Sequence, residues 1–409
     1  MRTYLTIITC ALAITAGAQV RVFEYGSESN EVCYRIPAIA TAQNGDVISV
    51  ADYRYCGSDI GYGRLSLHAR ISHDNGRTWG PIAVVAEAHE GKYGVHEAHD
   101  AEAGFGDPAI VADRESGNVL LLSCCGNVTY QVGTWEHHQG IARFRSADNG
   151  RTWSRYEDIA PAIYTMFKQA GVQPEALFVG SGRIFQSRTT KVGDYYRIYC
   201  VVLMRTKDMG GLNYVIYSDD FGETWSMLPG VGVTDGDEPK AEELPNGDII
   251  LSSRWWGRIF NIFHFADAAK AEGAWMEQAK SNLDNHGIVA ERNACNGEIM
   301  ILPVTRCDDG KAMWLALQSV PFGPNRANVG IYFKGLATPA DYSTPVRFAT
   351  YWEGRHQVSN INSAYSTMTL QKDGTIGFLF EESTFGKDYT IVYKNLTIEG
   401  ITSGAYRLR

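Results

Sequence analysis

Short apolar runs alternate along the chain with turns rich in Gly, Asp and Asn, and apolar helical periodicity is scarce. Short runs bounded by turn residues are typical of β-strands, whereas helices need longer periodic segments. We therefore expect an all-β protein, with strands at residues 119–124, 196–204, 248–253, 259–265, 329–333 and 376–380. Two segments depart from this pattern, and we predict helices over 157–170 and 266–282.

An eight-residue motif occurs three times between these strands. It reads SHDNGRTW from Ser72, SADNGRTW from Ser146 and SDDFGETW from Ser218, so the starts are 74 and 72 residues apart. In the shared pattern S-x-D-x-G-x-T-W, Asp accepts hydrogen bonds from the turn backbone, Gly supplies positive φ and Trp packs on the sheet. The spacing does not match the ligands of a calcium loop. We interpret the motif as a structural hairpin turn.

Regularly repeated hairpins describe a β-propeller, in which small antiparallel sheets repeat around an axis. Residues 19–409 accommodate six blades of about 65 residues, which exceeds the ~40–50 residues of common propeller repeats. The excess length is expected in loops, where functional sites usually lie. No linker rich in Pro or Ser divides the chain, so we predict one domain.

Residues 1–18 have the pattern of a secretory signal peptide. Arg2 precedes the apolar run Tyr4–Thr15, and Ala16-Gly17-Ala18 supplies small residues for cleavage. The run is too short for a membrane span. We expect an exported protein, periplasmic or extracellular, that begins at Gln19. Its seven remaining cysteines are an odd number, so we interpret most as small buried side chains, with room for one bridge that the sequence does not assign.

Composition and motifs remove several functional classes. The chain has 37 basic and 46 acidic side chains, a net charge of −9, which argues against nucleic acid as a ligand. It has no G-x-S-x-G elbow, no G-x-x-x-x-G-K-[ST] phosphate loop and no zinc-spaced Cys/His pattern. His96-Glu97-Ala98-His99 is one residue short of H-E-x-x-H, and we interpret it as a solvated loop. We expect no metal and no cofactor.

Three arginines stand at predicted strand ends. Arg35 opens a strand that continues through 38–40, Arg254 ends the strand at 249–253, and Arg326 begins another. Alone, each arginine would be read as a surface ion-pair residue. In a propeller, however, equivalent strand ends converge on the axis, where guanidinium groups can bind one carboxylate in a forked geometry. We predict an anion-binding cluster there.

Together these motifs resemble the bacterial exo-α-sialidases (neuraminidases), which are retaining glycoside hydrolases, and the resemblance runs from Arg35 to Glu381. The three turns match the family's Asp-boxes, and Tyr34-Arg35-Ile36-Pro37 matches its Arg-Ile-Pro signature with Tyr in place of Phe. The resemblance implies a six-bladed β-propeller with Asp-box turns as a catalytic domain over 19–409. It also implies release of terminal α-linked sialic acid with retention. A non-catalytic Asp-box propeller that binds carbohydrate or protein is the alternative.

The same resemblance implies roles for individual residues. Asp59 matches the general acid/base, Tyr365 the nucleophile and Glu238 the glutamate that activates it, with Glu242 and Glu243 as rivals for that place. The remaining matches are substrate contacts and one brace: Arg35, Arg254 and Arg326 for the sialic acid carboxylate, Arg54 and Asp107 for other parts of the sugar, and Glu381 behind the first arginine.

Two segments depart from the family pattern. Tyr332-Phe333-Lys334-Gly335 stands where a further Asp-box is expected, and Ser319-Val320-Pro321 replaces the usual Ser-Asn-Pro. Trp255 and Trp256 are candidates for the N-acetyl pocket. The implied partners are sialylated glycoproteins, glycolipids and oligosaccharides, with no nucleic acid, no membrane span and a monomeric state. Linkage preference, and transfer to a sugar or an internal hydroxyl in place of water, remain open.

Overall fold

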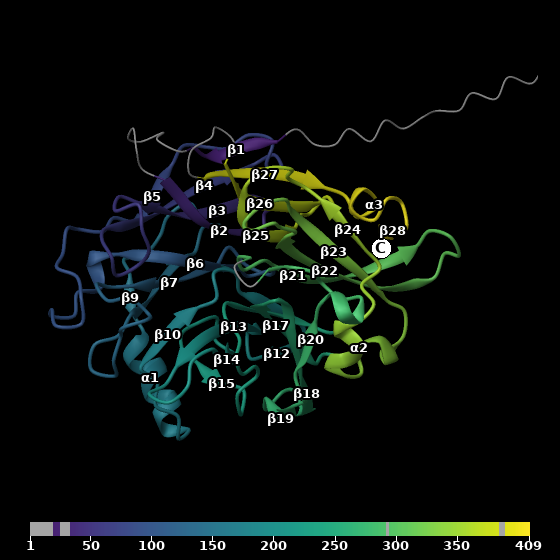
Figure 1. The fold of residues 1–409 in the computed structure, drawn as a ribbon. Helices are drawn as coiled ribbons and strands as arrows, with labels where there is room; N and C mark the ends of the chain where they lie inside the picture. Colours follow the sequence, from purple (N-terminus) through teal and green to yellow (C-terminus); the bar gives the residue numbers. More distant parts are fainter. Residues whose placement is uncertain (1–18, 25–32, 292–293, 384–388) are drawn as a thin grey trace, which may run out of the picture.

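The computed structural model describes residues 19–24, 33–291, 294–383 and 389–409, and the expected signal peptide (1–18) lies outside them. The described strands form six sheets around a common centre (Figure 1), which confirms the prediction of a six-bladed β-propeller. Innermost strands β2, β6 and β25 lie near the middle of this view, and β2 contacts the other two. Outer strands such as β5, β9 and β19 lie at the periphery.

The first three blades follow one another along the chain. The first comprises β2 (Cys33–Thr41), β3 (Val47–Arg54), β4 (Leu65–Ser72) and β5 (Ala83–Ala86). The second comprises β6 (Phe105–Ala112), β7 (Val119–Cys125), β8 (Gly140–Ser146) and β9 (Glu157–Asp158), with β11 (Gly182–Arg183) parallel to β6. The third comprises β10 (Ala176–Val179), β12 (Phe185–Val192), β13 (Tyr195–Arg205), β14 (Leu212–Ser218) and β15 (Ser226–Met227).

The last three blades complete the ring. The fourth comprises β16 (Pro239–Glu243), β17 (Ile249–Trp255), β18 (Gly257–Asp267), β19 (Glu272–Trp275) and β20 (Ala279–Ser281). The fifth comprises β21 (Ile299–Arg306), β22 (Ala312–Pro321), β23 (Val329–Leu336), β24 (Gly354–Gln357) and β28 (Tyr406–Leu408). The sixth comprises β25 (Ser363–Leu370), β26 (Ile376–Glu382), β27 (Thr390–Leu396) and β1 (Val20–Phe23). Helical elements are short: α1 (Ala160–Gln169), α2 (Pro345–Ala349), α3 (Ile398–Ile401), η1 (Ala101–Ala103), η2 (Leu283–Asn285) and η3 (Pro339–Tyr342).

The N-terminal strand closes the ring. β1 pairs antiparallel with β27, with Val20 opposite Tyr393, and so supplies the outer strand of the sixth blade. In Figure 1 the purple β1 lies beside the yellow β27. Strands from opposite ends of the sequence therefore share one sheet, which leaves no unpaired seam between first and last blades.

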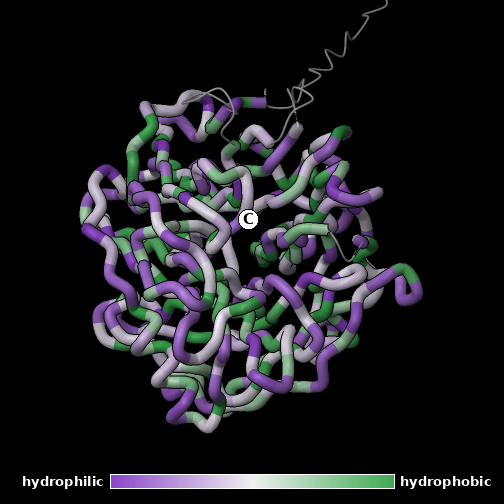
Figure 2. Tube along the Cα trace, turned by 60° about the vertical axis from the view of Figure 1, so that its left-hand side comes forward, coloured by the Kyte–Doolittle hydropathy of each residue, from purple (hydrophilic) through white to green (hydrophobic). Residues whose placement is uncertain are grey.

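Among the described residues, six large apolar clusters form layers between adjacent blades, and a seventh, small cluster surrounds Tyr365. The layer between the sixth and first blades, for example, joins Phe23 and Tyr393 to Tyr34 and Val47. Figure 2 shows mostly hydrophilic colour in the loops that project from the molecule, and hydrophobic segments among the strands. Because every layer is shared, no blade buries its apolar faces without its neighbours.

The three repeated turns have the predicted structure. In the first copy, Asp74 Oδ1 accepts hydrogen bonds from Ser72 Oγ and Thr78 N, each at 2.8 Å, and the other two copies repeat these contacts. The turn glycine adopts φ between +80° and +89° in all three copies. Each turn also contacts the preceding blade, where the glycine faces Tyr393, Ile48 or Leu120.

Of the two predicted helices, one is confirmed and one is wrong. α1 occupies Ala160–Gln169, within the predicted range 157–170. The range 266–282 instead contains a tight turn followed by β19 and β20, both paired with β18. Asp267 Oδ1 accepts a hydrogen bond from Lys270 N (3.2 Å), and the Trp275 ring packs on Phe263 (5.2 Å between centroids). Pairing with β18 thus overrides the helical propensity of this Ala-rich segment.

Candidate active site

The nine candidate residues come from five blades and share one end of the propeller. Four lie at the starts of innermost strands or just before them, four lie at the ends of second strands or in the loops beyond them, and one precedes a third strand. They are Arg35 (β2), Asp107 (β6), Glu238 (before β16) and Tyr365 (β25); Arg54 (β3), Asp59 (after β3), Arg254 (β17) and Glu381 (β26); and Arg326 (before β23). The expectation that Arg326 begins a strand is corrected, because β23 starts at Val329.

β-bulges distort three innermost strands beside these side chains. The register shifts between Arg35 and Ala38, between Gly106 and Ala109, and between Ser363 and Ser366. Two bulge residues, Ile36 and Asp107, adopt φ of +53° and +56°, although a side chain at such a φ is strained, most of all a β-branched one. Bulges re-aim side chains next to functional sites, and here they interrupt the ladder where the candidate residues emerge.

The Tyr365 hydroxyl donates a hydrogen bond to Glu238 Oε1. The other oxygen of that carboxylate accepts from Arg254 Nη1 (2.9 Å) and from Asn296 N (3.1 Å), so Glu238 is held on both sides. Burial and the Glu238 carboxylate raise the pKa of Tyr365 well above its usual value, while Arg254 and Arg326 oppose the rise. The phenol is therefore neutral at rest and needs a base, and Glu238 is placed to accept its proton.

Three guanidinium groups gather around Tyr365. The Cζ atoms of Arg35 and Arg326 lie 5.9 and 5.6 Å from the centre of the Tyr365 ring. Arg254 donates to Glu238, the carboxylate that also accepts from the Tyr365 hydroxyl. Arg35 is oriented from behind by Glu381, which accepts from its Nε (2.8 Å) and Nη2 (3.2 Å). The structure thus brings together the predicted arginine cluster, which can bind a carboxylate through forked hydrogen bonds.

The fourth arginine, Arg54, links two carboxylates of the site. Arg54 Nη2 lies 2.8 Å from Asp52 Oδ2 and 3.2 Å from Asp59 Oδ1. The Asp59 side chain is 56% exposed, as expected for a group that meets a leaving group at the mouth of a site. Asp107 is buried, and within the described part of the chain its Oδ2 has no hydrogen-bond partner, which leaves an acceptor for a ligand hydroxyl.

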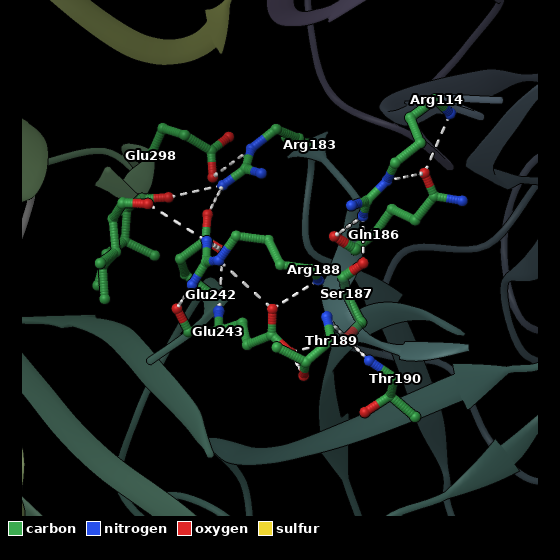
Figure 3. Close-up of polar contacts among 12 residues, drawn as sticks. Arg114, Arg183, Gln186, Ser187, Arg188, Thr189, Thr190, Glu242, Glu243 and Glu298 are labelled. Atoms are coloured by element: carbon green, nitrogen blue, oxygen red, sulfur yellow. Dashed lines mark hydrogen bonds and ion pairs between the residues drawn. The ribbon is translucent and has the colours of Figure 1, made fainter. Parts of the chain in front are cut away.

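The structure separates Glu238 from its two rivals. Glu242 and Glu243 lie at the far end of β16, where they bind Arg183 and Arg188 (Figure 3). A cavity of about 320 Å³ opens beside them at the ends of β2, β6 and β25, on the side of the ring away from Tyr365. Because these carboxylates already pair with arginines, we interpret the cluster of Glu242, Glu243, Arg183 and Arg188 as structural.

Other sequence candidates lie away from this chemistry. His99 of the His96–His99 loop is 3.4 Å from Asp158, and no metal-binding group of three His, Cys, Asp or Glu side chains occurs among the described residues. Six of the seven cysteines from Cys33 onward are free thiols: Cys56, Cys124, Cys125, Cys200, Cys295 and Cys307. Trp256, two residues after Arg254 in the sequence, is 55% exposed. In the described ranges, no helix is both long and apolar enough to cross a bilayer.

Sequence reasoning missed two neighbours of the site. Asp52 braces Arg54, and its signal was the D-x-R spacing, since residues i and i+2 of a strand share one face. Cys295 packs against Ile36, Ala364 and Tyr365, and burial raises the pKa of its thiol to about 12, so it acts as a small apolar side chain. Nothing in its sequence context distinguishes it from the other buried cysteines.

Comparison with known proteins finds an Asp-box family model and several sialidases. The BNR/Asp-box repeat family model matches residues 216–227, the third repeat. A sialidase of Micromonospora viridifaciens is 26% identical over 380 residues, covering 86% of this chain and 50% of that protein. A Bacteroides fragilis sialidase is 26% identical over 384 residues, covering 88% and 62%. The chain thus spans about half to three fifths of the length of these relatives.

Solved structures share the fold. The Hadza microbial sialidase Hz136 superposes with a TM-score of 0.67 at 22% identity, covering 94% of this chain and 69% of that one. The intramolecular trans-sialidase from Ruminococcus gnavus has a TM-score of 0.68 at 16% identity, covering 93% and 98%. Fold and site together define a six-bladed Asp-box propeller with an arginine-rich centre. The chain is similar in sequence and in fold to sialidases, which confirms the resemblance found in its motifs.

Proposed function

We propose that this protein is a retaining exo-α-sialidase that hydrolyses terminal α-linked sialic acid from glycoconjugates through a tyrosyl-enzyme intermediate. The observation that carries the proposal is the contact between the Tyr365 hydroxyl and Glu238, surrounded by three arginines. A buried tyrosine in a structural role needs only one neutral hydrogen-bond partner. A carboxylate acceptor next to cations instead fits a nucleophile that is deprotonated as it reacts.

The charge of the substrate explains the choice of nucleophile. The anomeric carbon of sialic acid carries a carboxylate, which would repel an anionic Asp or Glu, whereas a neutral tyrosine avoids this repulsion; sialidases are the tyrosine exception among glycosidases. The protein has a net charge of −9, so attraction for an anionic sugar must come from the local arginines. Arg35, Arg254 and Arg326 would bind the sugar carboxylate.

Each proposed step uses a residue of the site. In the first step, Tyr365 attacks the anomeric carbon while Glu238 takes the phenol proton and Asp59 protonates the leaving oxygen. In the second step, Asp59 removes a proton from water, water attacks the same carbon, and Tyr365 leaves with the proton returned by Glu238. Two displacements give net retention, and general acid–base assistance contributes about 10²–10⁴ in rate.

The test is replacement of Tyr365 by Phe, which removes only the reacting oxygen. The wild type should release free sialic acid from a fluorogenic sialoside, and Tyr365→Phe should reduce kcat by about 10³-fold or more with little change in stability. A 3-fluorosialyl fluoride should label Tyr365 covalently, as detected by peptide mass spectrometry. Tyr393→Phe is the matched control, because Tyr393 is also buried and its hydroxyl donates a hydrogen bond to a neutral acceptor, Asn75 O (3.1 Å).

Three outcomes would change the proposal. A near wild-type rate for Tyr365→Phe, or a label on another residue, would refute the tyrosyl mechanism. Binding of sialosides without turnover by the wild type would favour the non-catalytic propeller. An anhydro sugar or a sialylated acceptor as product would assign a transferase.

We further propose that the protein acts outside the cytoplasm, because residues 1–18 have the pattern of a signal peptide. Cleavage after Ala18 would leave β1, which starts at Val20, intact. N-terminal sequencing of the exported protein tests this proposal, and a start other than Gln19 would contradict it.

A further inference from the structure

Asp52 repeats an arrangement that Glu381 makes elsewhere in the site. Glu381 on β26 accepts from Arg35 Nε and Nη2, and it also accepts from the bulge amide Ile36 N (2.7 Å) on the next blade. Asp52 on β3 accepts from Arg54 Nε (3.2 Å) and Nη2 (2.8 Å), and also from the bulge amide Asp107 N (2.9 Å) on the next blade. Both carboxylates are fully buried. Each one orients an arginine and fixes a strained bulge.

The two arrangements differ in what the arginine faces. Arg35 faces Tyr365, whereas Arg54 faces Asp59, the proposed general acid, at 3.2 Å. Asp52 and Asp59 therefore share the Arg54 guanidinium, and Asp107 is close enough for the charges of all three groups to act on it. Like charges that lie close together oppose ionisation of one another.

Burial strengthens this effect. Desolvation raises the pKa of Asp52 to about 7 against the opposing charge of Arg54. Desolvation, followed by the charges of Asp59 and Asp52, raises the pKa of Asp107 well above its usual value. The buried carboxyl groups of Asp52 and Asp107 therefore resist ionisation more than the carboxyl group of an isolated aspartate does.

We propose that Asp52 is a positioning residue for the general acid: it fixes Arg54 beside Asp59 and offsets the charge of this guanidinium, so that Asp59 can hold the proton that it donates. This inference rests on the proposed function. Other groups also face the cluster from neighbouring elements, and they are common to wild type and variant: Arg35 on β2, Cys124 on β7 and Glu238 before β16.

The direction of the effect follows from charge. Asp52→Asn keeps the size of the side chain but removes one negative charge, and it leaves Arg54 with less compensation beside Asp59. Ionisation of the remaining carboxylates then becomes easier, so the proton is lost at a lower pH. A nearby charge shifts the pKa of a carboxyl group by about 1 or more.

The experiment compares pH profiles of kcat/KM for two substrates. With a sialyl-oligosaccharide, the leaving group needs a proton. For this substrate, the alkaline limb of the kcat/KM profile of Asp52→Asn should lie at a pH at least about 1 unit lower than that of the wild type. With sialyl fluoride, whose fluoride leaves without protonation, the profile should change little. Asp52→Glu, which restores the charge, should return the limb towards the wild-type position.

A control separates this role from a structural one. Asp248→Asn removes a buried carboxylate that likewise accepts a backbone hydrogen bond, from Phe265 N (3.0 Å), but at the opposite end of its blade. Asp248→Asn should leave the alkaline limb of the kcat/KM profile unchanged for both substrates. An equal loss of kcat/KM for both substrates in Asp52→Asn, without a moved limb, would show that Asp52 is only a brace and overturn the proposal. A limb that moves to higher pH would also overturn it.

A second measurement does not depend on turnover. Carbon NMR of aspartate carboxyl groups, with the Asp59 signal assigned from Asp59→Asn, follows the proton directly. Its titration midpoint should fall in Asp52→Asn relative to the wild type, and an unchanged or higher midpoint would contradict the proposal. If the wild type releases no sialic acid, the proposed function fails, while this titration still decides whether Asp52 controls the proton.

Discussion

Glu381 shows, at the scale of single residues, how one side chain can hold several others. Its two oxygens accept from Arg35, from Ile36 N and from Tyr365 N (3.2 Å), so it connects two innermost strands with an arginine of the site. Buried carboxylates are tolerated only when such partners satisfy them. The same carboxylate thus fixes both the proposed nucleophile strand and a proposed substrate-binding arginine.

Arg35 tests the importance of the guanidinium shape. Two of its nitrogens bind Glu381, which holds the planar group in one orientation towards the site. Lysine keeps the charge but cannot make a forked contact with Glu381 and face a ligand as well. Arg35→Lys should weaken inhibitor binding by about 10–100-fold, since hydrogen bonds to charged groups contribute about 1.5–3 kcal/mol each. Isothermal titration calorimetry with a sialic acid analogue measures the loss.

The control for this prediction is Arg145→Lys, on β8 of the second blade, where the half-buried Arg145 pairs with Glu223. Its inhibitor affinity should equal that of the wild type. Equal affinity for Arg35→Lys would show that Arg35 does not contact the ligand carboxylate.

At the scale of elements, the Asp-box turns join neighbouring blades as well as strands of one blade. A Cβ built on Gly76 would lie 2.1 Å from Cε1 of Tyr393, whose ring belongs to the sixth blade. The turn glycine is therefore required for two reasons, its positive φ and the close approach of an aromatic ring. This explains why the motif needs Gly rather than Asn or Asp.

Two glycine variants separate these reasons. Gly76→Ala combines a φ of +80° with the overlap on Tyr393, whereas Gly171→Ala has a φ of +82° and nothing within 4 Å. Left-handed backbone costs about 1–2 kcal/mol for a non-glycine residue, and overpacking adds about 1–3 kcal/mol. Gly76→Ala should therefore lower the free energy of unfolding by clearly more than Gly171→Ala, as measured by urea denaturation. Equal losses would mean that the contact with Tyr393 has no effect.

The missing fourth Asp-box has a structural replacement. Lys334 on β23 donates hydrogen bonds to the carbonyl oxygens of Arg347 (2.5 Å), Phe348 (3.1 Å) and Thr350 (2.6 Å) at the end of α2. A cation at a helix C-terminus satisfies carbonyl groups that lack partners within the helix. The departure from the family pattern therefore changes a blade turn and leaves the inner strands of the fifth blade in place.

At the scale of the whole molecule, stability depends on closure of the ring. Phe23 on β1 is fully buried and stacks on Tyr34 of the first blade, with centroids 4.9 Å apart. Because β1 belongs to the sixth blade, this contact joins the two ends of the ring. Every blade shares its apolar faces with two neighbours, so loosening one junction is expected to affect the entire domain.

Phe23→Ala tests this closure. Truncation of a buried Phe costs about 3–5 kcal/mol through lost burial and the resulting cavity. The variant should unfold in one transition at a clearly lower Tm in differential scanning calorimetry, because the blades are cooperative. Phe265→Ala, a half-buried ring on β18, should lower Tm less. A separate early transition for Phe23→Ala would show that the sixth blade unfolds on its own.

The sequence alone determined the local structure and the chemical inventory. The Asp-box turns follow from hydrogen bonds and φ preferences within eight residues, and α1 follows from a local pattern, so both were predictable. The motifs around Arg35, Asp59 and Tyr365 carried the resemblance to sialidases for the same reason. The helix expected at 266–282 failed because pairing with β18, which lies outside that window, decided its structure.

Only the tertiary structure decided which side chains meet. Glu238 was distinguished from Glu242 and Glu243 when β16 placed them at opposite ends of the channel, because successive positions along a strand are separated by about 3.3 Å each. The role of Asp52 depends on an amide of the next blade, 55 residues away. Such contacts arise from the radial arrangement of blades, and no local propensity encodes them.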